Sequence, residues 1–112
     1  MIIAMETEAE IKKALSYTGF AKRSGHLVVG SELVLSEIRR SAEGKTVLLA
    51  SDASDRTKKQ IRDKCTYYGV PLFEIADSDT LANAIGVKSS VAVLCVTDRS
   101  LSGAIENTLC AH

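Results

Sequence analysis

Short runs of hydrophobic residues alternate along this chain with longer segments in which hydrophobic residues return every three or four positions. The short runs are typical of buried strands, and the longer spacing is typical of amphipathic helices. The run "VAVLCV" at residues 91–96 is the most apolar, so we expect it at the centre of a sheet. The predicted strands cover residues 27–29, 46–50, 72–75 and 91–96.

Capping residues and glycines mark the ends of the first two predicted helices. Thr7 and Glu10 form a capping box at the start of the first helix, and Gly25 follows its last turn. The second helix is predicted over about residues 31–42, and Gly44 is expected to end it. Its candidate core residues are Leu33, Val34 and Ile38.

Further helices are predicted in the second half of the chain. They cover about residues 55–68, 81–85 and 98–109. The segment "SDASD" offers several N-caps for the first of these helices, and Asp98 or Ser100 is expected to cap the last. Because strands and helices alternate with short links, the pattern predicts a single α/β/α sandwich domain over residues 1–112.

The charges of the chain are balanced but unevenly distributed. The 14 Lys and Arg residues offset 14 Asp and Glu residues, which argues against a generic, strongly basic nucleic-acid binder. Residues 21–64 nevertheless contain ten basic and six acidic residues, a local excess of four positive charges. Aromatic residues make up only 4% of the chain, so a stacking surface of the RRM or OB kind is not expected.

The cysteines form neither a metal-binding nor a disulfide pattern. Cys65, Cys95 and Cys110 stand singly, without a CxxC pair or a nearby histidine. This odd and widely spaced set favours free thiols in a reducing compartment, and it predicts no metal and no cofactor. No apolar segment approaches the roughly 20 residues that span a bilayer, so we expect a cytoplasmic protein without membrane contact.

Few residues suit catalysis. His26 and His112 are the only histidines, and His26 lies in a basic turn where a solvent-facing role is favoured over proton transfer. Asp52, Asp55 and Asp98 follow predicted strands, a common place for an α/β active site, but helix capping is the simpler interpretation. The chain contains no P-loop motif and no GxGxxG motif. We therefore expect a protein that is not an enzyme.

Basic residues surround a strand–glycine–helix segment, "GHLVVGSELVLSEIRR", at residues 25–40. A helix that begins directly after a strand can point its N-terminal N–H groups at a phosphate. Flanking cations favour the same ligand, although a solvated, charged helix surface is the alternative interpretation. The cations are Lys22, Arg23, His26, Arg39, Arg40, Lys45, Arg56, Lys58, Lys59, Arg62 and Lys64.

The order of short motifs along the chain resembles one known family. The motifs are "GFAKRSGHLVVGSELVLSEIRR", "KTVLLASDASDRTKKQIRDKCTYYGVPLFEI" and "LANAIGVKSSVAVLCVTD". They are similar to the kink-turn RNA-binding ribosomal protein family, the L-seven-Ae/L-thirty-e superfamily, and to its small bacterial branch encoded near transcription and translation factors. The resemblance covers about residues 7–110. It implies a three-layer α/β/α sandwich with a mixed central sheet that binds sharply bent RNA.

The resemblance also implies where RNA would bind. Family members use the N-terminal part of the second helix and the loop before the short fourth helix, here residues 76–80. The expected RNA-binding residues are Lys22, Arg23, Gly30, Ser31, Glu32, Leu33, Ser36, Arg39 and Arg40. The expected partners are structured RNA, either rRNA or a kink-turn-like element, and ribosome or translation-factor proteins, but not DNA.

Three positions depart from the family pattern Gly-x-Asn-Glu-x-x-Lys. Aligned on Gly30, this chain has Glu32, Leu33 and Ser36 where the family has Asn, Glu and Lys. Glu32 can accept hydrogen bonds from a guanine edge, whereas Leu33 cannot and Ser36 lacks the charge and reach of lysine. We therefore expect binding led by phosphate contacts, with altered or lost kink-turn specificity. The alternative function is a protein-interaction adaptor on the same fold, with Leu33 and Leu35 in its contact surface.

Overall fold

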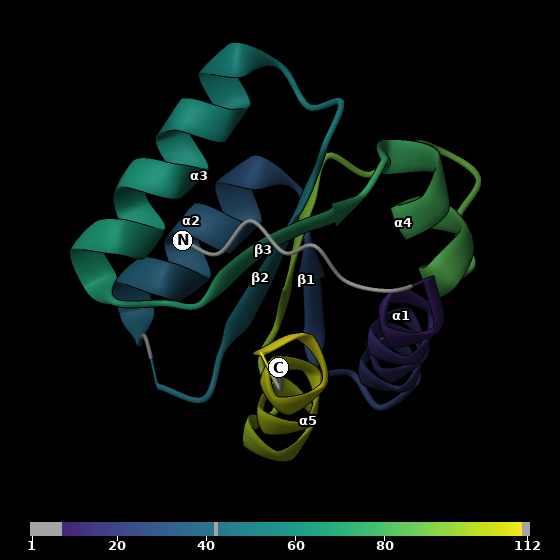
Figure 1. The fold of residues 1–112 in the computed structure, drawn as a ribbon. Helices are drawn as coiled ribbons and strands as arrows, with labels where there is room; N and C mark the ends of the chain where they lie inside the picture. Colours follow the sequence, from purple (N-terminus) through teal and green to yellow (C-terminus); the bar gives the residue numbers. More distant parts are fainter. Residues whose placement is uncertain (1–7, 42, 111–112) are drawn as a thin grey trace.

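The computed structural model describes residues 8–41 and 43–110, and for Cys110 the backbone alone. The predicted capping residue Thr7 and the terminal His112 lie outside these residues. Helices and strands alternate as the sequence pattern predicted (Figure 1). In chain order they are α1 (Glu8–Arg23), β1 (Leu27–Val29), α2 (Ser31–Arg40), β2 (Thr46–Ala50), α3 (Asp55–Tyr68), β3 (Leu72–Ala76), α4 (Ser78–Ile85), β4 (Val93–Val96) and α5 (Arg99–Cys110).

The strands of the described residues form a mixed sheet in the order β1-β4-β2-β3. Strand β4 is antiparallel to both β1 and β2, whereas β2 and β3 run parallel. Cys95 of β4 lies opposite Val28 on one side and opposite Val47 on the other. The prediction of a central strand within residues 91–96 is therefore confirmed, and β1 and β3 are the edges of the sheet.

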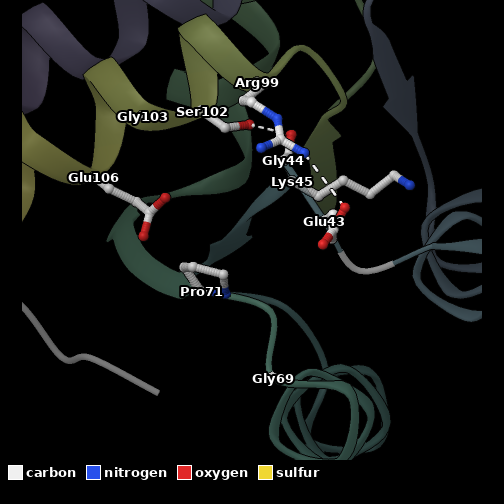
Figure 2. Close-up of a pocket in the computed structure, with 9 residues that line it drawn as sticks. All are labelled: Glu43, Gly44, Lys45, Gly69, Pro71, Arg99, Ser102, Gly103 and Glu106. Carbon is white, nitrogen blue, oxygen red and sulfur yellow. Dashed lines mark hydrogen bonds and ion pairs between the residues drawn. The ribbon is translucent and has the colours of Figure 1, made fainter.

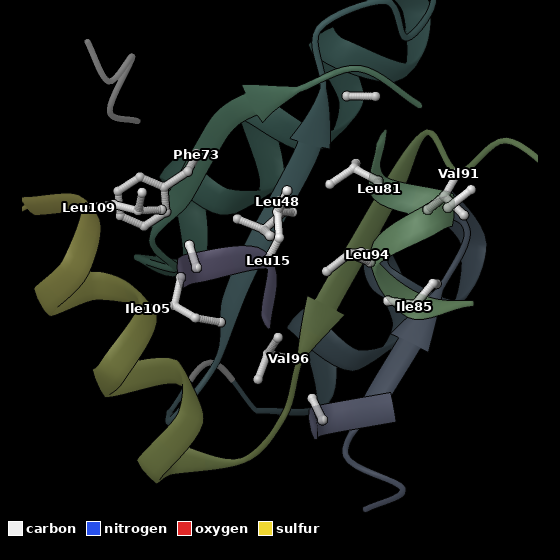
Figure 3. Packing of buried hydrophobic residues seen from close by; sticks show 14 residues of the cluster. Leu15, Leu48, Phe73, Leu81, Ile85, Val91, Leu94, Val96, Ile105 and Leu109 are labelled. Atoms are coloured by element: carbon white, nitrogen blue, oxygen red, sulfur yellow. The ribbon is translucent and has the colours of Figure 1, made fainter. Parts of the chain in front are cut away.

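The side chains of β2 and β4 alternate between the two faces of the sheet and divide the core in two. The residues that face α2 and α3 are Val47, Leu49, Val93 and Cys95. The residues that face α1, α4 and α5 are Leu48, Ala50, Leu94 and Val96 (Figure 3). Helices therefore cover both faces, which confirms the three-layer α/β/α sandwich with a mixed sheet (Figure 1).

Three helices begin with a polar side-chain cap of the kind that the sequence predicted. Ser54 caps α3, Asp77 caps α4 and Asp98 caps α5. Their side-chain oxygens accept hydrogen bonds of 3.2, 2.8 and 2.9 Å, respectively, from the backbone N–H three residues further on. The interpretation of Asp98 as a helix cap is therefore confirmed, and Ser100 lies within the first turn of α5.

Leu33 is not a core residue, contrary to the sequence prediction. Its side chain is 59% exposed, while Val34 and Ile38 are fully buried. The four-residue spacing of Val34 and Ile38 directs both side chains toward the sheet. Leu33 lies about 100° around the helix from Val34, because an α-helix has 3.6 residues per turn, and it therefore faces solvent.

Three element boundaries also differ from the prediction by more than one residue. Helix α2 ends at Arg40, earlier than expected, because Ser41 has an extended backbone. Helix α4 begins earlier than expected, at Ser78, where the capping carboxylate satisfies its first turn. Strand β4 begins at Val93 rather than at Val91, since the Val91 N–H donates to the Ser78 carbonyl at 3.1 Å instead of pairing within the sheet.

Replacing Leu48 by alanine is expected to destabilise the fold by about 2–5 kcal/mol, because Leu48 is fully buried and the change leaves a cavity. Leu33→Ala is the matched control, with an expected change within about 0.5 kcal/mol because its side chain is exposed. Urea unfolding followed by circular dichroism measures both values. Equal destabilisation by the two changes would contradict this assignment of the core.

Candidate nucleic-acid interface

The junction between β1 and α2 is built around Gly30. Its φ of 100° and ψ of 147° lie in a region that favours glycine. The Gly30 N–H donates to the Val93 carbonyl at 3.0 Å, and the Gly30 carbonyl accepts from the Val34 N–H at 3.0 Å. No side chain caps α2, so the three N–H groups between Gly30 and Val34 have no acceptor among the described residues. They form the positive end of the helix dipole and are open to an anion.

One face of α2 is exposed along its whole length. It begins beside Gly30 and Ser31 and extends over about 15 Å, the length of a ten-residue helix. From the N-terminal to the C-terminal end it presents Glu32, Leu33, Ser36, Arg39 and Arg40. The structure therefore brings together all the predicted site residues of this helix, and we call this face the α2 stripe.

A buried lysine holds the C-terminal end of α2 against the start of β2. Lys45, only 5% exposed, lies 3.4 Å from the Glu37 carboxylate and also donates to the Ser41 carbonyl. Arg40 donates two hydrogen bonds to the same carboxylate at 3.1 and 3.2 Å. The hydrogen bond from Arg40, with Lys45 beside it, holds the pKa of Glu37 below its usual range. Arg39 has no ion-pair partner among the described residues, so its charge is available to a ligand.

Lys22 and Arg23 lie far from Gly30. They end α1, which covers the opposite face of the sheet from α2, and their turn leads to the beginning of β1, whereas Gly30 follows the end of β1. The His26 carbonyl, at that beginning, accepts from the Thr97 N–H at 2.9 Å. The structure therefore separates these cations from the glycine by the length of β1, on the order of 10 Å for a three-residue strand.

Three loops meet at the Gly30 end of the sheet. The bond from Gly30 to Val93 places the segment before β4 beside α2. The Ser51 N–H donates to the Ala76 carbonyl at 2.9 Å, which joins the loops after β2 and β3. Asp52 accepts from the N–H and the hydroxyl of Ser78, both at 2.8 Å, so Asp52 positions the start of α4.

Sequence reasoning missed the segment between α4 and β4. Lys88, Ser89 and Ser90 are all exposed there, and the chain leads from them to Val93, whose carbonyl accepts from the Gly30 N–H. The signal in the sequence is a run of three polar residues between Gly86, which ends α4, and the apolar strand that follows. A short polar run of this kind predicts a loop but does not reveal its neighbours.

Carboxylates outnumber cations at the Gly30 end of the sheet, where the first turn of α3 also contributes Arg56. Strands β1, β2 and β3 run in one direction, so the helices that follow them all begin at this end. Their caps, loops and first turns contribute Glu32, Asp52, Asp55, Asp77 and Asp79. Hydrogen bonds from Thr80 hold the pKa of Asp77 below its usual range. A phosphate is therefore better placed on the axis of α2 than beside the predicted second loop at residues 76–80.

The cysteines of known environment are poor nucleophiles and poor metal ligands. Cys65 and Cys95 are buried, and burial raises the pKa of each thiol to about 12. Among residues 8–41 and 43–110, no group of three or more His, Cys, Asp or Glu side chains is arranged to hold a metal ion. In the same ranges, no helix is long and apolar enough to cross a membrane.

A cavity of about 350 Å³ lies at the end of the sheet opposite Gly30 (Figure 2). Arg99 lies 3.3 Å from the Glu43 carboxylate at this cavity, and Ser102 Oγ lies 3.0 Å from the Gly44 carbonyl. Glu106 adds a second carboxylate to the lining, while Lys45 is already paired with a carboxylate of α2. The charges of this cavity are balanced, so it does not extend the cationic surface of the α2 stripe.

Residues 9–105 of the chain match the model of the ribosomal protein L7Ae/L30e/S12e/Gadd45 family. The chain therefore belongs to this family, and the resemblance visible in the sequence motifs is confirmed.

Particular relatives are named as RNA-binding proteins. The RNA-binding protein YlxQ of Bacillus subtilis (strain 168) is 40% identical over 91 residues, which cover 81% of this chain and 89% of that protein. The protein of the same name from Enterococcus faecium is 40% identical over 79 residues, or 70% of this chain and 76% of that protein.

Solved structures show the same fold. A Bacillus halodurans protein described as having unknown function has a TM-score of 0.80 at 33% identity, over 87% of this chain and 96% of that one. The Giardia lamblia 15.5kD RNA binding protein has a TM-score of 0.79 at 20% identity, over 94% and 91% of the two chains. At that identity the likeness concerns the fold.

Glu37→Gln is expected to lower the free energy of unfolding by about 1–2 kcal/mol at pH 7, because it removes the charged partner of the buried Lys45. The ion pair with Arg40 adds little to this value, since Arg40 is exposed and solvent screens its charge. Since folding lowers the pKa of Glu37, its contribution is present above the ordinary value of 4.5 and is lost as the pH falls through the folded pKa. Denaturant unfolding of both proteins between pH 7 and pH 3 should therefore give a difference that shrinks in acid. A pH-independent difference would contradict this assignment.

Proposed function

We propose that this protein is a non-catalytic RNA-binding protein of the cytoplasm, associated with rRNA or the ribosome, that binds structured RNA through the N-terminus of α2 and flanking basic residues. The supporting observation is the row of three unpaired N–H groups behind Gly30, which continues into the α2 stripe. Family membership and the names of the YlxQ relatives support RNA as the ligand.

An RNA phosphate is held on the axis of α2. Gly30 has no side chain, and the space that a Cβ atom would fill there is open, so a phosphate can approach the backbone closely. The N–H groups of Ser31, Glu32 and Leu33 donate to its oxygens, with the helix dipole favouring the negative charge. Neutral N–H donors bind the phosphate at an end of the sheet where carboxylates outnumber cations, and Asp77 and Asp79 limit how much RNA can lie beside α4.

Bases are recognised along the α2 stripe, from its first turn as far as Ser36. The Glu32 carboxylate accepts hydrogen bonds from the N–H groups of a guanine edge, and Leu33 contributes apolar contact. Ser36 offers a hydroxyl where a lysine would offer a charge. A sheared G·A step is therefore contacted by fewer donors than Asn, Glu and Lys would provide, so kink-turn RNA is bound with altered specificity.

Cations beyond the tip hold the RNA backbone. Arg39 and Arg40 lie on the same stripe as Glu32 and contact the duplex that leaves the bent region. Lys22 and Arg23 contact phosphates only where the RNA continues around the edge strand β1. Removal of the arginine pair should therefore weaken binding more than removal of the α1 pair.

The double variant Arg39→Gln/Arg40→Gln is expected to weaken binding of a hairpin RNA and to reduce the slope of log affinity against log salt by about one for each phosphate that the variant no longer neutralises. Lys22→Gln/Arg23→Gln should have a smaller effect. Lys13→Gln is the control, because it removes an exposed charge of α1 that lies beside α5, on the opposite face of the sheet from α2. Electrophoretic mobility shifts at increasing salt measure all three. The proposal fails if structured RNA does not shift at low salt, or if the control weakens binding as much as the arginine pair.

Kink-turn preference is tested with two RNAs that differ only in the sheared G·A pairs, replaced by Watson–Crick pairs in the second. The structure favours a preference that disappears in Glu32→Ala, because that carboxylate is the acceptor nearest the unpaired N–H groups. Titration of both RNAs with the native protein and with Glu32→Ala gives the two affinity ratios. Ratios that are equal in the two proteins would remove Glu32 from base recognition.

The 59% exposure of Leu33 also supports a second function, a protein-interaction adaptor on this fold. Capture from a nuclease-treated lysate separates the two functions. Protein partners that survive nuclease, and that are lost with Leu33→Ser, favour the adaptor. Partners that disappear with nuclease favour RNA binding.

A further inference from the structure

Helix α3, which contacts α2, is rich in basic residues. It contains five cations, Arg56, Lys58, Lys59, Arg62 and Lys64, and the two acids Asp55 and Asp63. Arg62 is bound to Glu74 at 2.6 and 2.8 Å, and Lys59 is paired with an acid of its own helix at 3.4 Å. The remaining three cations of α3 have no ion-pair partner among the described residues: Arg56, Lys58 and Lys64.

The position of α3 continues the surface that begins at Gly30. Helices α2 and α3 cover the same face of the sheet and contact each other (Figure 1). Both follow strands that run antiparallel to β4, so both helices begin at the Gly30 end and run away from it. RNA that lies along the α2 stripe therefore has helix α3 beside it.

An exposed aromatic ring ends this helix. The side chain of Tyr67 is 80% exposed, although tyrosine rings are usually more deeply buried. Tyr68 packs against the core beneath α3, and its ring meets that of Tyr67 edge-to-face with centroids 4.9 Å apart. Lys64 lies one helical turn before Tyr67, within side-chain reach. The surface thus combines a supported aromatic face with an unpaired cation, the pair of groups that an unpaired nucleotide requires.

We propose that α3 is a second RNA-binding surface, on which Tyr67 stacks with an unpaired base that extends from the structured RNA, while Lys64 contacts the phosphate of that strand. This inference rests on the proposed RNA-binding function. RNA is favoured over a protein partner because Arg56 and Lys64, two unpaired cations on the same side of α3 as Tyr67, complement a polyanion. The protein would then bind a bent duplex along α2 and its single-stranded extension on α3.

The chain contains no tryptophan, so Tyr67→Trp introduces a unique fluorescent reporter at the proposed stacking site. We expect its emission to be quenched by a hairpin RNA with an unpaired extension but not by the same hairpin with blunt ends. Asn107→Trp is the control, since Asn107 is exposed on α5, on the opposite face of the sheet, and its emission should not respond. Tyr67→Trp emission that is the same with both hairpins, while both RNAs bind, would overturn the inference.

Substitution tests the energetic contribution of the ring. Tyr67→Ala is expected to weaken binding of the extended RNA by about 5- to 150-fold, the range for loss of one stacked base, and to leave binding of the blunt RNA unchanged. Tyr67→Phe retains the stacking face and should bind the extended RNA as the native protein does. Equal affinity of Tyr67→Ala and native protein for the extended RNA would refute the second surface. Failure of both RNAs to bind the native protein would instead refute the proposed function itself.

Discussion

The antiparallel placement of β4 between β1 and β2 is the constraint on which the rest of the structure depends. All four residues of β4 are fully buried, so helices must cover both of its faces. Because β1, β2 and β3 run opposite to β4, helices α2, α3 and α4 all begin at one end of the sheet. The hydrogen bond from Gly30 to Val93 then ties the start of α2 to the first residue of the central strand. The candidate interface is therefore a consequence of the sheet topology.

That topology also separates charges that cancel in the composition. First turns and caps gather carboxylates at the Gly30 end, whereas α2 and α3 present cations along their length. A polyanion at this surface meets neutral N–H donors at the tip and guanidinium and ammonium groups further along. Much of the local excess of positive charge at residues 21–64 lies on α2 and α3, which form one helical layer of the sandwich. Lys22 and Arg23 belong to the same segment of sequence but end α1, which lies in the other layer.

Much of the fold could be predicted from local patterns. The run at residues 46–50 is buried on both faces, as its continuous apolar character predicted, and the caps at Ser54 and Asp98 follow from rules that involve only four consecutive residues. Leu33 shows where apolar character alone misleads. Ser36 and Glu37, one turn after it, are polar, whereas Val34 lies one turn before Ile38 and both of these are buried.

The candidate site divides in the same way. The sequence by itself determined that a glycine precedes α2, that arginines end this helix, and which family motifs surround it, because these are properties of neighbouring residues. Only the tertiary structure decided that the face shared by Glu32, Arg39 and Arg40 is exposed, that Lys22 and Arg23 lie at the far end of β1, and that the start of β4 lies beside Gly30. The physical reason is strand pairing. Hydrogen bonds between strands that are distant in sequence determine which helix ends and loops become neighbours in space. A local sequence pattern does not show which strands pair.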